Sequence, residues 1–163
     1  ATYFAISSGN TESAENVWGG TGYPYLISVA SPLDVFAGGY ETTVTYSEQE
    51  MKTRILRTAP KADLSGSASG WIGATECSSA GTVKSILLGG QKRSGNQARS
   101  AFNLRSANFT VAYADGNFTF TVKGYGHNVG MSQAGAQAMA KQGADYKQIL
   151  AWYYPSTALA KQG

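Results

Sequence analysis

The chain has 163 residues, of which 42% are hydrophobic and 14% are charged, with a formal net charge of +3. This length fits one domain with a substantial core, and the composition excludes a disordered or coiled-coil chain. No helix-turn-helix, RNA-recognition or zinc-finger pattern accompanies the basic residues, which favours solvated charged faces over a nucleic-acid site. A mildly basic chain also suits an acidic polymer as partner.

Cysteine and histidine usage limits the possible metal chemistry. Cys77 and His127 are each the single residue of their type. One cysteine cannot form an intrachain disulfide, and a structural zinc site usually needs about four ligands, so we expect no metal and no cofactor. No apolar run approaches the length of a membrane span, so this segment is expected to make no membrane contact.

The N-terminal part predicts a strand, a short helix and a second strand. The first residues, Thr2–Ile6, form a strand-like run with no signal-peptide pattern before it, which suggests a processed or trimmed product. Glu12–Trp18 predicts one or two helical turns capped by Asn10 or Thr11. Alternating residues over Tyr40–Tyr46 predict a further strand.

The next segment predicts a helix followed by a loop. Ser47-Glu-Gln-Glu50 is a capping box, and the helix should end near Thr58 because Pro60 disfavours helical geometry at the residue before it. A loop rich in Ser and Gly follows over 65–70. We expect Lys52, Arg54 and Arg57 to share the helix, and Lys92, Arg93 and Arg99 to share one later loop.

The C-terminal half contains the clearest local signals. Thr82–Leu88 predicts a strand, and two alternating runs on either side of Asp115-Gly116 predict a hairpin. Helices are expected from Ser132 to about Gln142 and over Asp145–Tyr153. The prediction is an α+β fold: a mostly antiparallel, curved sheet with helices packed at one side, in a single domain over 1–163.

Residues 124–133 read Gly-Tyr-Gly-His-Asn-Val-Gly-Met-Ser-Gln and hold the only histidine. Glycines at this density allow positive φ angles or close backbone approach to a ligand. His127 is therefore expected in a tight turn near a helix N-terminus, where backbone N–H groups can meet a polar ligand. A buried histidine bonded to a carbonyl group explains the same residues equally well.

Two long motifs in this chain resemble a known family. The first runs from Tyr3-Phe4 through Ser7-Ser8-Gly9-x-Thr11-Glu12 to Trp18-Gly19. The second is the Gly124 motif with its continuation Ala-Gly-Ala-Gln-Ala-Met-Ala, followed by Tyr146-x-x-Ile-Leu-x-x-Tyr-Tyr-Pro155. Together they resemble the stage II sporulation protein D family, also called the amidase-enhancer LytB family, over nearly the whole chain.

The resemblance implies a bacterial cell-envelope or secreted protein that acts on peptidoglycan glycan strands. Family members are similar to lytic transglycosylases, which cleave the glycosidic bond without water and leave an anhydro sugar. One carboxylic acid with a raised pKa can serve as acid and then as base in that chemistry. The family's catalytic glutamate lies upstream of the first motif, so we expect this chain to lack it and to be truncated at its N-terminus.

The site expected from the resemblance is a cleft for the glycan. The substrate-binding candidates are Ser7, Ser8, Thr11, Glu12, Trp18, Gly126, His127, Ser132 and Gln133. Glu12 and His127 are the two weak catalytic candidates in the chain. A glutamate in the first turn after a cap also serves the helix dipole, and a tryptophan in this position either stacks on a sugar or packs in the core.

Two residues depart from the family pattern, and other functions stay open. Asn10 stands where a basic residue or glycine is usual, and Asn128 where a glycine usually follows the histidine. One alternative is a non-catalytic wall-binding module that activates an N-acetylmuramoyl-L-alanine amidase, which would then be the partner. A small serine hydrolase is a further alternative, although no Gly-x-Ser-x-Gly elbow occurs. Whether the chain itself is an enzyme is uncertain from its sequence.

Overall fold

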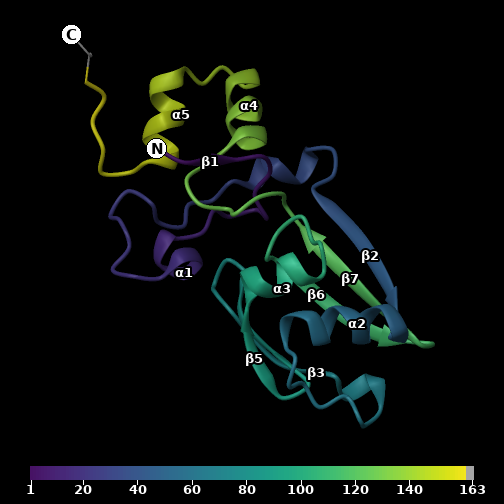
Figure 1. The fold of residues 1–163 in the computed structure, drawn as a ribbon. Coiled ribbons are helices and arrows are strands. Elements are labelled where there is room, and N and C mark those ends of the chain that lie inside the picture. The colour runs from purple at the N-terminus through teal and green to yellow at the C-terminus, as the bar shows by residue number, and fades with distance from the viewer. Residues whose placement is uncertain (161–163) are drawn as a thin grey trace. The chain divides into compact units, whose positions relative to one another are not determined.

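A computed structural model describes residues 1–160 of the chain. It contains helices together with mainly antiparallel sheets, which confirms the predicted α+β class (Figure 1). The chain groups into two compact units. Unit 1 joins residues 1–40 to the residues from Gly124 onward, and unit 2 comprises Glu41–Lys123.

The first sheet of unit 2 has the strand order β2-β7-β6, with β2 at Glu41–Ser47, β7 at Asn117–Lys123 and β6 at Phe109–Ala114. Both pairs are antiparallel. Asp115 and Gly116 link β6 to β7 with φ angles of 48° and 75°, as a two-residue hairpin turn requires. The predicted hairpin and the predicted strand before Ser47 are therefore confirmed.

The second sheet of unit 2 has the order β3-β4-β5, all antiparallel, with β3 at Ile72–Cys77, β4 at Val83–Leu88 and β5 at Gln91–Ser94. The predicted strand over Thr82–Leu88 is confirmed as β4. Register shifts interrupt the pairing of β3 with β4 at two places. Such irregularities bend an edge strand and disrupt its ladder.

Two capped helices pack in unit 2. In α2 (Glu48–Thr58) Ser47 and Glu50 form the predicted capping box. A second box at Ser94 and Gln97 begins α3 (Gly95–Ala101), and a short 3-10 turn, η2, spans Ala68–Gly70. The core includes fully buried aromatic and aliphatic side chains, among them Met51, Ile55, Phe102, Phe118 and Phe120.

The basic residues of unit 2 follow the prediction in part. Lys52, Arg54 and Arg57 lie on α2 as expected. The shared loop expected for the second group is wrong, because Lys92 and Arg93 lie on β5 and Arg99 lies on α3. A strand and a capped helix occupy that segment.

Unit 1 is built from both ends of the sequence. Its elements are β1 (Tyr3–Phe4), α1 (Ala14–Trp18), η1 (Pro32–Phe36), β8 (Met131–Ser132), α4 (Gln133–Lys141) and α5 (Tyr146–Tyr153). Strand β1 pairs in parallel with β8, although their sequence positions are far apart. The predicted strand over Thr2–Ile6 is thus shorter than expected.

Side-chain caps define the helices of unit 1. Ser13 caps α1 by accepting from the Asn16 N–H, so the expected cap at Asn10 or Thr11 is wrong. The reason is that the backbone before Ser13 is extended, with the Thr11 N–H donating to Val29 O at 2.8 Å. Ser132 and Asp145 cap α4 and α5 at the predicted positions.

Candidate functional site

The two sequence motifs lie against each other within unit 1. Ile6 and Tyr125 exchange two backbone hydrogen bonds of 3.1 and 2.7 Å, and the Glu12 N–H donates to Asn128 O at 2.6 Å. The glycines of the second motif allow this approach. A Cβ at Gly126 would lie 2.8 Å from the Cβ of Phe4, and Gly126 also has a φ of 118°.

His127 lies in a loop before α4 and is held by the backbone of its own motif. The Val129 N–H donates to Nδ1 at 3.1 Å, while Nε2 lies 3.4 Å from the Thr2 hydroxyl. Because Nδ1 accepts the Val129 N–H, it carries no proton, and the ring is the neutral tautomer whose proton is on Nε2. This assignment, inferred from the bonding geometry, makes Nε2 a hydrogen-bond donor.

Two aromatic rings pack against the imidazole. Trp18 lies with its ring centroid 5.4 Å from that of His127, and Phe4 lies at 5.7 Å in an edge-on arrangement. Phe4 is buried, whereas 52% of Trp18 is exposed to solvent. Trp18 is therefore a surface residue that contacts the His127 ring at a tilted angle.

Glu12 is buried and is not an acid that a ligand can reach from solvent. It is 1% exposed, and its Oε1 accepts from the Ser13 N–H and from the Asn16 amide, both at 2.9 Å. Both donors belong to the first turn of α1 or its cap. The carboxylate thus stabilises the N-terminus of this helix, where negative charge is favourable.

The two departures from the family pattern are connected. Asn128 has a φ of 68°, a left-handed conformation that asparagine tolerates better than most side chains. Its amide nitrogen donates to the Asn10 carbonyl at 2.8 Å and to the Ser8 hydroxyl at 3.1 Å. Asn128 therefore adds a side-chain link between the two motifs that a glycine cannot make.

Unit 1 also holds a buried carboxylate that no motif of the sequence indicates. Asp34 on η1 is 0% exposed and accepts from the Ser7 N–H at 2.7 Å and from the Ser132 hydroxyl. Its other oxygen accepts from the Ser31 hydroxyl at 2.5 Å, and the same distance separates Ser31 from the Tyr153 hydroxyl. Asp34 thus joins the first motif, the cap of α4 and the end of α5.

These hydrogen-bonded side chains around Asp34, together called the Asp34 hub, leave no room for a side chain at position 135 of α4. A Cβ at Gly135 would lie between 2.1 and 2.5 Å from oxygen atoms of Tyr153, Ser31 and Asp34. Burial raises the pKa of Tyr153 to about 12, with a further increase from the Asp34 charge and an opposing effect of the Ser31 hydrogen bond. The phenol therefore stays protonated and available as a donor at neutral pH.

The predicted substrate-binding residues separate by exposure. Ser7, Thr11 and Ser132 are fully buried, and their polar groups bond to other parts of unit 1. Gln133 is exposed at the start of α4, and Ser8, Gly126 and His127 are partly exposed. Of the predicted substrate-binding residues, these four and Trp18 are therefore accessible to a ligand in this conformation.

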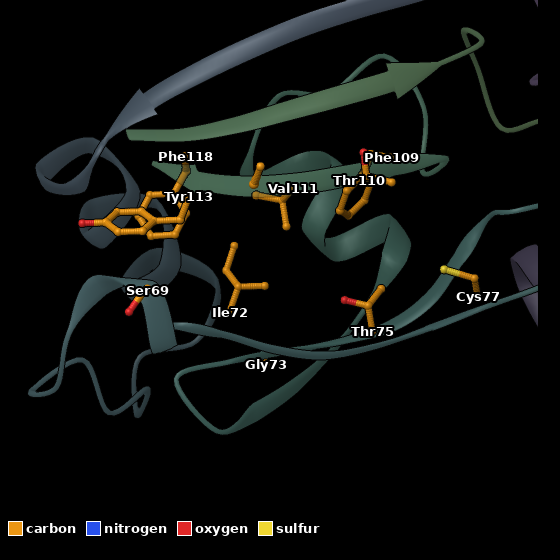
Figure 2. A pocket seen from close by; sticks show the side chains of 11 residues that line it. Ser69, Ile72, Gly73, Thr75, Cys77, Phe109, Thr110, Val111, Tyr113 and Phe118 are labelled. Carbon is orange, nitrogen blue, oxygen red and sulfur yellow. The ribbon is translucent and has the colours of Figure 1, made fainter. Parts of the chain in front are cut away.

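A separate groove of about 370 Å³ lies in unit 2 between β3 and β6. Figure 2 shows Ile72 and Val111 pointing into it, with Thr75 and Cys77 further along β3. No charged side chain lines it, and none of the predicted site residues belongs to it. Within 1–160, no three His, Cys, Asp or Glu side chains gather as metal ligands, and no helix is long and apolar enough to cross a membrane.

Curated relatives match almost the whole chain. Stage II sporulation protein D of Bacillus amyloliquefaciens is 35% identical over 161 residues, which cover 99% of this chain and 45% of that protein. The protein of the same name from Bacillus subtilis strain 168 is 34% identical, with the same coverage. The amidase enhancer of Bacillus subtilis is 29% identical over 216 residues, covering 98% of this chain and 29% of that protein.

No family model matches the sequence. The chain spans less than half the length of these relatives. The similarity nevertheless extends over both motifs and all the structural elements between them. The resemblance found in the motifs is therefore confirmed, and the chain is a homologue of the stage II sporulation protein D and amidase enhancer proteins.

Proposed function

We propose that this chain binds peptidoglycan glycan strands through unit 1, as part of a bacterial lytic transglycosylase acting outside the cytoplasm. The observation that carries the proposal is Trp18, which is half exposed and supported by the His127 ring. An exposed indole offers an apolar face and a polar N–H, which together fit a sugar ring.

Two polar side chains of the motifs, His127 beside Trp18 and Ser8, suit an N-acetyl sugar. The Nε2–H of His127 faces the Thr2 hydroxyl at a long 3.4 Å and could exchange that contact for a sugar hydroxyl or carbonyl oxygen. The partly exposed Ser8 hydroxyl donates to Asn10 O and accepts from Asn128, and its second lone pair could accept from the sugar. His127 would then position the glycan without transferring a proton, because protonation of Nδ1 would remove the acceptor of the Val129 N–H. Glu12, buried against α1, would have a structural role.

In this proposal the catalytic acid lies outside these 163 residues. A carboxylic acid would protonate the glycosidic oxygen and then, as a carboxylate, accept the proton of the sugar's own hydroxyl as the anhydro ring closes. The contribution of the present chain would be to hold the strand in place for that reaction.

The second candidate is a non-catalytic wall-binding module that activates an amidase. The similarity to a protein named amidase enhancer favours it. Both candidates need glycan binding and differ in the reaction that follows, so the products distinguish them.

Glycan binding can be tested by calorimetric titration with chitooligosaccharides and purified glycan strands. We expect Trp18→Ala to weaken binding at least about fivefold, since an aromatic stacking contact contributes about 1–3 kcal/mol. Trp152→Ala is the matched control, because Trp152 is a similarly exposed tryptophan (48%) on α5. Equal affinities of the wild type and Trp18→Ala would contradict the proposed site.

The reaction can be tested by mass spectrometry of glycan digests. We expect the 163-residue chain to release no anhydro products, whereas a chain extended upstream of the first motif by a segment that carries the acid releases them. Anhydro products from the 163-residue chain would contradict an external acid and implicate Glu12. Acceleration of an added amidase, without anhydro products from the extended chain, would favour the second candidate.

A further inference from the structure

Unit 2 carries an excess of positive charge that glycan binding does not use. Ten Lys and Arg residues stand against six Asp and Glu between Glu41 and Lys123, a formal net charge of +4. Helix α2, strand β5 and helix α3 carry six of these cations.

Two arginines of α2 converge on a single atom. Arg54 Nη1 and Arg57 Nη2 each donate to Ala101 O at 3.1 Å, so the two nitrogens are at most about 6 Å apart, the sum of the two bond lengths. Ala101 is the last residue of α3, where backbone carbonyls have no partner within the helix and carry partial negative charge. That carbonyl holds two like charges together.

Neighbouring groups fix the pair in place. The Arg54 guanidinium lies 4.1 Å from the ring centroid of Tyr46, whose hydroxyl donates to Phe102 O at 2.7 Å. Arg93 donates from Nε to Thr58 O at 2.7 Å and so adds a positive charge at the C-terminus of α2. The Arg54 side of the pair is therefore held by the Tyr46 ring.

No carboxylate neutralises the pair. Within residues 1–160, neither Arg54 nor Arg57 has an acidic side chain at salt-bridge distance. Glu50 is one turn away on α2, but its carboxylate accepts from the backbone N–H and the hydroxyl of Ser47. Those bonds are the main reason for its lowered pKa, and the Arg54 charge is a smaller one. Most N–H donors of the two guanidinium groups thus stay available.

We propose that Arg54 and Arg57 form a binding site for an oxyanion, either a phosphate or a carboxylate group. A guanidinium presents its donors in a planar fork that matches two oxygens of such a group. Ala101 O takes one N–H of each fork, so an anion would bind the remaining N–H groups of the pair. There it would relieve the mutual repulsion of the two charges, a favourable term that an isolated surface arginine does not supply. The site lies in unit 2 and does not depend on glycan binding.

The test uses two small probes with the whole 163-residue chain, inorganic pyrophosphate and citrate, followed by calorimetry and by amide chemical shifts. We expect one or both to bind, with shifts at Arg57, Ala101 and Phe102. Tighter binding of pyrophosphate assigns a phosphate ligand, and tighter binding of citrate assigns a carboxylate. Absence of shifts at these residues with both probes would overturn the proposal.

Variants separate a specific site from general attraction. Arg57→Gln should weaken binding about tenfold, because it removes an exposed guanidinium that forms part of the site. Arg57→Lys keeps the charge but loses the fork, so it should give an intermediate affinity. Lys52→Gln is the matched control, with the same charge change on the same helix, and should change affinity less than about twofold. Equal losses for Arg57→Gln and Lys52→Gln would also overturn the proposal.

Discussion

The Asp34 hub predicts that unit 1 cannot accept a methyl group at Gly135. The added Cβ would lie 2.1 Å from the Tyr153 hydroxyl, 2.4 Å from Ser31 Oγ and 2.5 Å from Asp34 Oδ2. These three side chains are at most 3% exposed, so none can move into solvent. Gly135→Ala must therefore displace α4 or break the hydrogen bonds of Asp34.

The size of the effect follows from three terms. Overpacking of a filled site costs about 1–3 kcal/mol. A buried polar group deprived of a partner costs about a further 1–3 kcal/mol. Alanine in a helix recovers about 1 kcal/mol relative to glycine. The net loss is about 3 kcal/mol, which corresponds to a fall in melting temperature of roughly 6–12 °C for a chain of this size.

The assay is thermal unfolding followed by calorimetry, with Gly38→Ala as the matched control. Gly38 also lies in unit 1, has no positive φ, and has no atom within 4 Å of an added Cβ. Its substitution should change stability by less than about 0.5 kcal/mol. Adding Tyr153→Phe to Gly135→Ala should recover part of the loss, because the closest oxygen is removed. A melting temperature of Gly135→Ala equal to that of Gly38→Ala would refute the reasoning.

Further outcomes are expected from other substitutions. Because the pKa of Tyr153 is raised from 10.0 to about 12, its stabilising contribution is complete below pH 10 and is lost as the pH rises toward 12; thermal melts of Tyr153→Phe against pH should lack that part of the alkaline loss. His127→Gln should retain most of the glycan affinity, whereas His127→Ala should lose about 1–3 kcal/mol of it by calorimetry; unchanged binding with a large fall in melting temperature would make His127 a structural residue. Ser47→Ala should destabilise the chain by about 1 kcal/mol in urea unfolding, because the capping box of α2 is lost. Elemental analysis should find no stoichiometric metal.

The parts of the fold that were predicted correctly are those marked by turn or capping residues within their own segments. Asp115-Gly116 fits a two-residue hairpin turn, and Ser47 and Glu50 mark a helix start, so these elements follow from their own residues. Helix α3 had a similar signal that was missed, the pair Ser94 and Gln97 three residues apart. Strand β3 had no such signal, because most of its residues are exposed and its register is interrupted.

The candidate site was predictable only as two motifs. Ser8, Trp18 and His127 belong to those motifs, and the structure brings the motifs together. Asp34 was not predictable, because two of its three partners, Ser7 and Ser132, are distant in sequence and nothing in its local sequence indicates burial. Likewise, the convergence of Arg54 and Arg57 depends on the end of a different helix.

The parallel pairing of β1 with β8 has a consequence for the order of folding. Unit 1 needs residues from both ends of the chain, so during synthesis it stays incomplete until the second motif has emerged. Unit 2 is contiguous, and its first and last residues, Glu41 and Lys123, are register partners on β2 and β7. Once those strands pair, the flanking segments are held close together, as the hydrogen bond from Gly124 N–H to Tyr40 O reflects.

If the two segments of unit 1 paired first, they would close a loop made of the whole unfolded unit 2, at a considerable cost in chain entropy. Unit 2 would therefore fold early and hold the N-terminal and C-terminal segments of unit 1 close together. Because Glu41 and Lys123 pair across β2 and β7, a change in the length of the loops within unit 2 would leave the spacing of the two motifs unchanged. Variation in the middle of the chain is thereby separated from the loop that carries His127.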